Sequence, residues 1–314
     1  MKIWILLGAL AVCLAALAVL EVALRLGFGF GNPPLYVADE GMGYVLAPNQ
    51  RLRRFGNRIH INEYAMRSAA VSSLPAPDTL RLLLLGDSLA NGSWWTDQAD
   101  ILSARIAYHL QAALPKPYQQ VEALNASANS WGPRNELAYL ERYGTFGAGV
   151  LILMLNTDDL FGTQPTSLQV GRDRSYPSQK PSSAIAEVIG RYLKKNQPIL
   201  GLEEIQSEGG DRVGKNLDAI SAIHSYATAT DAKFILVLSP LKRELPGPRD
   251  YEIVARTRLK DWATAANIPY LDLLPVYQQH PDAESLYRDH IHLSPVGNEL
   301  VSEAIAQVIP PLFP

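Results

Sequence analysis

Short apolar runs alternate with helix-like patterns from about residue 78 to the end of the chain. The runs typical of strands are residues 80–85, 120–126, 149–156, 233–239 and 269–274. Between them, residues 99–114 and 134–143 carry apolar side chains at spacings of three and four, which predicts helices. Strands that are apolar on both faces and alternate with helices predict a parallel sheet covered on both sides, the three-layer α/β/α architecture.

Two further patterns shape this domain. A last helix is predicted from Ser294 and Pro295, a hydroxyl at the N-cap followed by proline at the first helical position. Residues 157–214 interrupt the alternation with a segment rich in Pro, Ser and Gly that holds one plausible helix, at 183–195. Long excursions inside compact domains are usually functional covers or disordered inserts, and we expect a cover over the substrate site.

The N-terminal pattern is different. Residues 3–20 contain no charge, and the apolar run resumes at 22–24 after Glu21, which is long enough to span a bilayer. Lys2 precedes the run, so the expected orientation has the N-terminus in the cytoplasm and the body outside. A cleaved signal peptide would need a cleavage site of small residues, and the end of this run offers no convincing one. A lipoprotein would need a small residue just before Cys13, where this chain has Val12. We therefore expect an uncleaved anchor.

These patterns divide the chain into three parts. Residues 1–26 are the expected transmembrane anchor, and residues 27–77 form a stem and an extension of short extended segments that ends in a polar loop. Residues 78–314 are the expected catalytic domain, which includes the 157–214 insert.

Composition narrows the possible functions. A hydrophobic fraction of 47% and a charged fraction of 19% fit a globular protein. The net charge of −3 does not suggest a surface that binds nucleic acid. We interpret the basic cluster of Arg51, Arg53, Arg54 and Arg58 as a solvated strand face or a membrane-proximal surface. The single cysteine, Cys13, excludes an intramolecular disulfide and any cysteine-rich zinc site.

Polar and small residues follow the predicted strands at the points where those strands end. Ser88 follows the first strand, residues 125–132 the second and residues 156–159 the third. A further polar segment, residues 288–298, precedes the last helix. Ligands of open α/β sheets bind at the carboxyl ends of the strands, so these segments predict one pocket.

The residue types at this edge fit nucleophilic catalysis. A serine hydroxyl needs a histidine base that is oriented by a carboxylate, and one short segment can supply both Asp289 and His292. The charge that develops on the attacked carbonyl oxygen needs donors. Gly86 allows a sharp turn that aims the Ser88 N–H inward, and Asn156 is an available amide.

At these residues the chain resembles the GDSL, or SGNH, hydrolase family of esterases and lipases. The segment LLLLGDSLANG resembles the family's first block and RDHIHLSPVGN its last block. The resemblance implies a flavodoxin-like three-layer fold, Ser88 as nucleophile, and Asp289 and His292 as its triad partners, with no cofactor and no metal.

The middle blocks of the resemblance depart from the family pattern. Ser130 stands where the family usually has an oxyanion glycine, and Asp158 stands where it usually has an amide. Only a backbone N–H is needed at the first position. Asn156 lies two residues before Asp158, on the same face of an extended strand, so we expect Ser130 and Asn156 to complete the oxyanion hole.

The expected substrate is an acetyl or other short acyl ester on cell-envelope or exported polysaccharide. The extension resembles that of membrane-anchored, periplasmic members of the family, which implies a bacterial inner-membrane protein with its catalytic domain outside. Trp94 and Trp95 either stack on a sugar ring or pack the loop after Ser88 against a neighbouring helix. The sequence gives no prediction of oligomeric state.

Three alternatives remain open at this stage. The same triad could transfer an acyl group to a sugar hydroxyl, which would make the protein an O-acyltransferase. The chain could also be a catalytically silent module of an envelope complex. Finally, His290 and His292 with Asp289 could bind a metal, although no further ligand is evident in the sequence.

Overall fold

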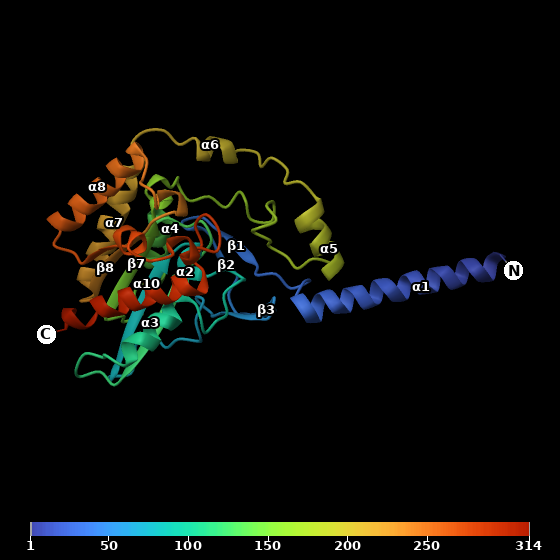
Figure 1. The fold of residues 1–314 in the computed structure, drawn as a ribbon, viewed down its shortest axis with the longest axis horizontal. Coiled ribbons are helices and arrows are strands. Elements are labelled where there is room, and N and C mark those ends of the chain that lie inside the picture. The colour runs from blue at the N-terminus through green and yellow to red at the C-terminus, as the bar shows by residue number, and fades with distance from the viewer. Residues whose placement is uncertain (1, 314) are drawn as a thin grey trace.

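The computed structural model describes residues 2–313, and a five-stranded parallel sheet lies at its centre (Figure 1). The strands are β5 (Thr79–Gly86), β6 (Gln120–Ser127), β7 (Val150–Asn156), β8 (Lys233–Ser239) and β9 (Tyr270–Asp272). Their order is β6-β5-β7-β8-β9, and every neighbouring pair is parallel. This is the flavodoxin-like order, so the predicted fold class is confirmed.

Successive side chains of the strands point into two separate cores. Leu82 and Leu84 pack on the face covered by α3 (Leu102–Gln111) and α10 (Pro295–Val308). Leu83 and Leu85 pack on the opposite face, which is covered by α4 (Pro133–Tyr143), α7 (Arg212–Ala229) and α8 (Asp250–Ala265). Because strand side chains alternate between faces, strands that are apolar throughout require both layers of helices.

The helix predicted at 99–114 is shorter at both ends. Asp97 accepts hydrogen bonds from the N–H groups of Arg58 and Ala99, which holds the chain before α3 in a turn. Two prolines, Pro115 and Pro117, follow the helix and disfavour its continuation. The remaining short helical elements are α2 (Ser88–Asn91), η2 (Thr157–Phe161), η4 (Lys242–Glu244), α9 (Leu274–Gln278), η5 (Ala283–Leu286) and η6 (Pro310–Leu312).

The extension forms two antiparallel hairpins. Strand β1 (Tyr36–Asp39) pairs with β2 (Gly43–Leu46), and β3 (Gln50–Arg54) pairs with β4 (Asn57–Ile61). Its buried residues, among them Tyr44 and Ile61, belong to the same core as Leu83 and Leu85. The extension and the sheet domain therefore share one core.

Arg67 joins the extension to the loop that follows α2. Its side chain is buried, with 1% of its surface exposed, and it donates to the carbonyl oxygens of Asn91 (2.6 Å), Ser93 and Thr96 (2.5 Å). A charged donor shared among several buried carbonyls fixes the path of this loop, because each carbonyl would otherwise lack a partner.

At the N-terminus, α1 (Lys2–Ala23) continues as the π-helical turn η1 (Leu24–Phe28) and projects from the body (Figure 1). The most apolar stretch of this helix has a mean hydropathy of 2.8, and none of its residues is buried. The helix is therefore long and apolar enough to cross a membrane, a property that signal sequences share. The Glu21 carboxylate accepts from the N–H groups of Ala184 (2.8 Å) and Ile185 (3.0 Å). These residues begin α5 (Ala184–Val188), which lies beside the end of α1.

The insert forms an arch over one side of the body (Figure 1). The helix predicted at 183–195 is present as α5 followed by the π-helical turn η3 (Ile189–Leu193). The arch continues through α6 (Leu202–Gln206) to α7.

Replacement of Arg67 tests the connection between extension and catalytic loop. Arg67→Met keeps most of the apolar stem but leaves three buried carbonyls without their donor, so we expect the free energy of unfolding to fall by about 2–4 kcal/mol. Denaturant unfolding of the detergent-solubilised protein measures it. Arg51→Met, at an exposed arginine of β3, is the control and should change stability by less than about 0.5 kcal/mol. Equal effects of the two substitutions would contradict this role.

Candidate active site

Ser88 is presented by a sharp turn at the end of β5. It is the first residue of α2, and the preceding Asp87 caps this helix by accepting from the Leu89 N–H at 2.8 Å. A Cβ atom at Gly86 would lie 2.8 Å from the carbonyl oxygen of Met154, so only glycine fits this close approach to β7. The turn therefore places Ser88 at the carboxyl edge of the sheet.

The structure brings Ser88, His292 and Asp289 together. The His292 Nε2 atom lies 2.9 Å from Ser88 Oγ, and His292 Nδ1 lies 2.8 Å from Asp289 Oδ2. Burial alone would raise the pKa of Asp289, but the N–H groups of His292 and Ile291 and the His292 ring outweigh it and hold the pKa below its usual range. An ionised Asp289 favours the tautomer in which Nδ1–H donates to it and Nε2 accepts from Ser88.

Comparison with known proteins identifies the family. The sequence model of the GDSL-like lipase/acylhydrolase family matches residues 84–300, a range that contains all three of these residues. The chain belongs to this family. As a member, it is a carboxylic ester hydrolase.

Solved structures of hydrolases are similar to this chain. A lipase/acylhydrolase from Enterococcus faecalis is 15% identical, covers 75% of this chain and 97% of its own, and gives a TM-score of 0.45. An acetylxylan esterase from Geobacillus stearothermophilus, solved as a catalytic mutant, is 13% identical, with coverages of 75% and 95% and a TM-score of 0.47. The structure named TesA is 16% identical, with coverages of 74% and 99% and a TM-score of 0.47. No curated protein matches the chain.

In this GDSL-like hydrolase, Ser130 has the backbone conformation that suits a glycine. Its φ is +58°, in the left-handed region, where a side chain is strained and glycine is not. The hydroxyl of Tyr176, from the insert, donates to Ser130 Oγ at 2.9 Å, and Tyr44, from the extension, donates to the carbonyl of the preceding Asn129 at 2.6 Å. The insert and the extension therefore both hold the segment that contains Ser130, the residue that stands where the family usually has glycine.

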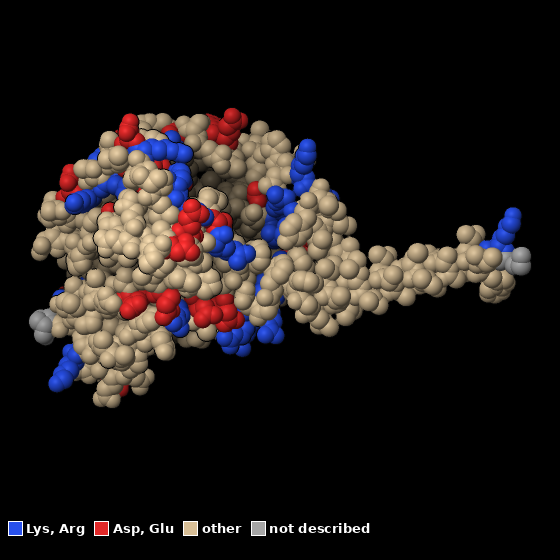
Figure 2. Space-filling model, viewed as in Figure 1, with Lys and Arg blue, Asp and Glu red and all other residues tan. Residues whose placement is uncertain are grey.

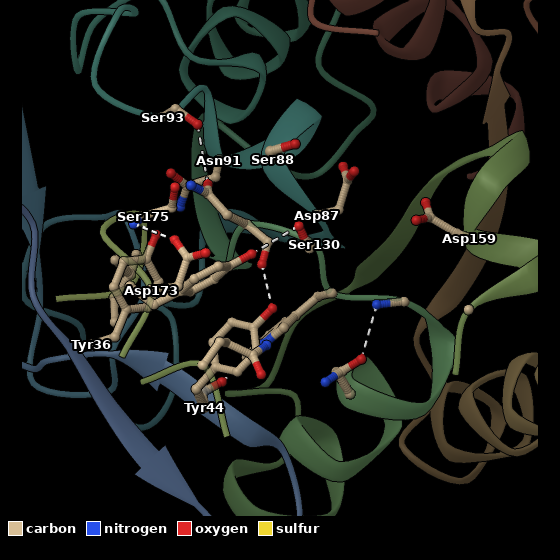
Figure 3. Close-up of a pocket in the computed structure, with 18 of the residues that line it drawn as sticks. Tyr36, Tyr44, Asp87, Ser88, Asn91, Ser93, Ser130, Asp159, Asp173 and Ser175 are labelled. Atoms are coloured by element: carbon tan, nitrogen blue, oxygen red, sulfur yellow. Dashed lines mark hydrogen bonds between the residues drawn. The ribbon is translucent and has the colours of Figure 1, made fainter. Parts of the chain in front are cut away.

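Two backbone N–H groups lie near the Ser88 hydroxyl. Among residues 2–313, the N–H of Ser130 has no hydrogen-bond acceptor, and the N–H of Ser88 interacts with the Asp87 carboxylate of the preceding residue. Both residues line one cavity, and Figure 3 shows them on the segments that follow β5 and β6. These N–H groups can therefore serve as oxyanion donors.

The Asn156 amide is directed elsewhere. Its Nδ2 donates to Asp87 Oδ2 at 2.9 Å and to Asp159 Oδ2 at 2.8 Å, so both amide hydrogens have partners. This geometry argues against the prediction that Asn156 donates to the oxyanion. Sequence spacing placed Asn156 on the correct edge, but its amide is oriented by Asp159, three residues later in a capping box, and by Asp87, which comes from the end of a different strand.

A group of buried carboxyls surrounds Asp87, the residue before Ser88, and the sequence did not predict it. Burial raises the pKa of Asp87 to about 6, although hydrogen bonds from Leu89 and Asn156 lower it. Burial and the nearby charges of Asp87 and Glu136 hold the pKa of Asp159 well above its ordinary value. Burial likewise raises the pKa of Glu136, whose carboxylate oxygens have no hydrogen-bond partner among residues 2–313. Burial therefore favours the protonated form of each of these carboxyls.

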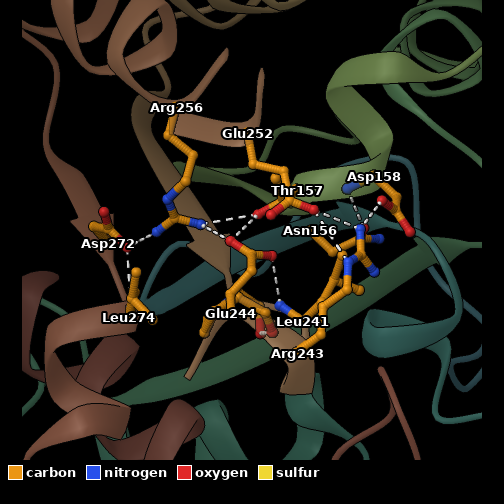
Figure 4. A network of polar contacts seen from close by, with 12 residues as sticks. Asn156, Thr157, Asp158, Leu241, Arg243, Glu244, Glu252, Arg256, Asp272 and Leu274 are labelled. Atoms are coloured by element: carbon orange, nitrogen blue, oxygen red, sulfur yellow. Dashed lines mark hydrogen bonds and ion pairs between the residues drawn. The ribbon is translucent and has the colours of Figure 1, made fainter. Parts of the chain in front are cut away.

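Asp158, the second departure from the family pattern, is held by an arginine (Figure 4). Arg243 donates to Asp158 Oδ1 and to Glu252 Oε1, each at 2.8 Å. The neighbouring Thr157 accepts from Arg256, which also bonds Glu244. These bonds join the end of β7 to the loop after β8 and to α8, and the Asp158 charge is compensated by Arg243 rather than directed at the oxyanion.

The cavity has a volume of about 640 Å³ and is lined by the sheet domain, the extension and the insert. The extension contributes Tyr36 and Tyr44, and the insert contributes Gln164 and Tyr176. The rings of Tyr36, Tyr44 and Tyr176 pack edge to face at 5.0–5.9 Å. The insert thus lines the same cavity as Ser88 and His292.

The rings of the two tryptophans contact the extension and the segment that carries His292. Trp94 lies 4.9 Å from the ring of Phe55 in the extension, and Trp95 lies 4.6 Å from the ring of His292. Both line the cavity and stay partly exposed. His290, the other histidine of this segment, is 82% exposed, and its Nδ1 is 3.8 Å from Asp289 Oδ1.

A double-mutant cycle tests the position of Ser130. Tyr176→Phe removes one hydrogen bond to a strained residue, so we expect kcat to fall about fivefold with little change in KM. In a Ser130→Gly background, where the left-handed conformation needs no support, the same substitution should change kcat less than about twofold. Steady-state hydrolysis of a soluble acetyl ester measures both.

Tyr36→Phe is the control for this cycle, because Tyr36 packs in the same aromatic cluster and its hydroxyl has no hydrogen-bond partner among residues 2–313. It should leave kcat unchanged. An equal loss from Tyr176→Phe in both backgrounds would show that Tyr176 acts by some route other than Ser130.

The buried Asp87 predicts a pH-dependent stability. Its pKa is raised on folding, so the native state is favoured when Asp87 is protonated and loses stability as the pH rises through about 6. Asp87→Asn removes this titration and keeps an N-cap side chain. Relative to the wild type, the variant should gain on the order of 2 kcal/mol between pH 4 and pH 8.

Thermal unfolding across this pH range provides the measurement. Asp158→Asn, at a half-exposed carboxylate paired with Arg243, is the control and should show no such gain. A difference between Asp87→Asn and wild type that stays constant with pH would contradict the prediction.

Proposed function

We propose that the protein is a serine esterase in which Ser88 is the nucleophile, His292 the general base and Asp289 the residue that orients His292. His292 Nε2 takes the Ser88 proton as Oγ attacks the ester carbonyl, and the tetrahedral oxyanion accepts from the N–H groups of Ser88 and Ser130. The imidazolium then returns the proton to the departing alcohol, which leaves an acyl group on Ser88. Water, activated by the same base, releases the acid.

The observation that carries this proposal is the hydrogen bond between Ser88 and His292. The two residues are 204 positions apart in the chain, yet Oγ and Nε2 are 2.9 Å apart, at the edge of the sheet where the family model also matches. Nucleophile, base and orienting carboxylate are within hydrogen-bond reach in the order that acyl transfer requires.

The proposed substrate is a short acyl ester on a polysaccharide of the cell envelope. The cavity lining supports this, because it mixes aromatic rings with amide and charged side chains, which include Gln164, Gln169 and Asp173. Hydroxyl-rich saccharides need such donors and acceptors beside flat apolar faces, whereas a long acyl chain would need a mainly aliphatic lining. A volume of about 640 Å³ is within the range of ligand pockets.

The proposed location is the outer side of the cytoplasmic membrane, with α1 retained as the anchor. The bonds from Glu21 to the start of α5 support retention, because cleavage after α1 would remove the acceptor of two backbone N–H groups.

Active-site labelling and hydrolysis test the proposal. Ser88→Ala should lose at least about a thousandfold in kcat/KM on acetyl esters and lose labelling by a fluorophosphonate. Ser93→Ala is the matched control, since Ser93 lines the same cavity but donates to Asn129; it should retain both. Labelling that survives in Ser88→Ala would overturn the assignment.

The acceptor is tested separately, with an acetyl donor and an oligosaccharide. Free acetate as the product supports the esterase. Acetylated saccharide would instead assign the O-acyltransferase reaction to the same triad, and no turnover with no labelling would assign a silent module.

A further inference from the structure

The surface at the base of α1 exposes large apolar side chains. Leu26 is 83% exposed and Leu193 is 75% exposed, and Phe28, Ile189 and Tyr192 are exposed beside them in sequence. Soluble surfaces rarely carry so many large apolar side chains on short neighbouring segments, so this surface is suited to an apolar partner.

These side chains form one patch. The rings of Phe28, Phe30, Phe55 and Tyr192 lie 5.6–6.3 Å from one another along three contacts that link η1, the β3–β4 turn and η3. We define the basal patch as the exposed apolar residues of these segments: Leu26, Phe28, Phe55, Ile189, Tyr192 and Leu193.

Buried polar contacts fix the basal patch relative to α1. Arg54 pairs with Glu187 at 2.7 Å with both side chains buried, and Glu187 also accepts from the Gly31 N–H at 2.6 Å. Glu21, in the last turns of α1, holds the start of α5. The end of α1 and the patch therefore form one base, and a bilayer that contains α1 reaches the patch.

The charge on these segments is strongly one-sided. Residues 21–31, 50–61 and 184–195 contain eight lysines and arginines and two acidic residues, Glu21 and Glu187, which pair with Arg25 and Arg54. Figure 2 shows a largely uncharged surface where α1 meets the body, with Lys and Arg side chains beside it. Apolar side chains bordered by basic ones suit the interface of an anionic bilayer.

We propose that the basal patch seats in the headgroup region of an anionic bilayer, an inference that rests on the proposed role of α1 as an anchor. A bilayer is favoured over a protein partner because the patch is continuous with a helix that itself needs a membrane. Arg51 and Arg53, the exposed arginines of β3, then take the membrane-proximal role that the sequence left open for the basic cluster. Arg54 is instead buried against Glu187, and Arg58 pairs with Asp97.

Contact of the basal patch with the bilayer would also hold the active site near the membrane. Ring contacts of 5.7, 4.9, 5.3 and 4.6 Å connect Phe28, Phe55, Trp94, Trp95 and His292 in series. The basal patch thus supports the loop that packs on the proposed catalytic base. The active site is held close to the bilayer, where it takes acyl esters on saccharides presented at the membrane surface.

Quenching of a site-specific fluorophore tests whether the basal patch lies in the bilayer. In a Cys13→Ser background, the full chain with Leu193→Cys is labelled with an environment-sensitive fluorophore and placed in nanodiscs of equimolar phosphatidylglycerol and phosphatidylcholine. Leu200→Cys is the matched control, a leucine of the same insert that is 94% exposed and lies on the arch toward α6.

The probe at position 193 should be quenched by nitroxide lipids and shielded from iodide, and the probe at 200 should show the reverse. Iodide quenching at 193 equal to that at 200 would overturn the seat. Shielding of position 193 from both quenchers would also overturn it, because it would indicate a protein interface.

The double variant Tyr192→Ser, Leu193→Asp tests the consequence for the substrate. Hydrolysis of an acetylated glycolipid in the nanodisc should fall about fivefold, while hydrolysis of a soluble acetyl ester is unchanged. Equal rates on the glycolipid would overturn delivery from the membrane surface. A wild type that hydrolyses neither ester would refute the proposed function, and the quenching result would still decide the seat.

Discussion

The hydrogen bond between Ser88 Oγ and His292 Nε2 closes a loop of 204 residues, and most of the fold serves to make it possible. Gly86 lets β5 turn against β7, which sets the serine side. On the histidine side, Arg288 N–H donates to the His292 carbonyl at 2.8 Å, and Tyr287 pairs with Leu293. A Cβ atom at Gly297 would lie 2.1 Å from the Leu286 carbonyl oxygen, so α10 approaches this loop as closely as only glycine permits.

The same constraint explains why polar groups are buried where they reduce stability. Asp87 must follow Gly86 to cap α2, and this position places its carboxylate beside Asn156 and near Asp159 and Glu136. Buried like charges are costly, and the fold tolerates them here because the surrounding sheet and helices are packed on both faces. Proteins commonly lose some folding stability at a functional site, where the geometry of a few side chains must be fixed.

The sequence predicted the sheet well, because strands that are apolar on both faces have few alternative explanations, and Ser88, Asp289 and His292 mark its edge. It predicted less about the groups around them. The direction of the Asn156 amide depends on Asp159 and on Asp87, and only the sheet brings Asp87 to Asn156. Tyr176 lies in an irregular insert with no periodic signal, so its bond to Ser130 could be found only from the three-dimensional structure.

The outer segments emerge as parts of the active site rather than attachments to it. The extension positions the loop after α2 through Arg67, and together with the insert it holds Asn129 and Ser130. The insert meets the end of α1 through Glu21, and the extension meets the insert through Glu187. These contacts link the proposed anchor, the insert and the proposed oxyanion donor Ser130.

The most direct test of the central claim is the detection of the acyl-enzyme. Wild-type protein is quenched with acid during turnover of an acetyl ester, digested and analysed by mass spectrometry. We expect one acetyl group, carried on the peptide that contains Ser88 and located on that serine. An acetyl group on another residue, or turnover with no covalent adduct under conditions where deacylation is slowed, would contradict it.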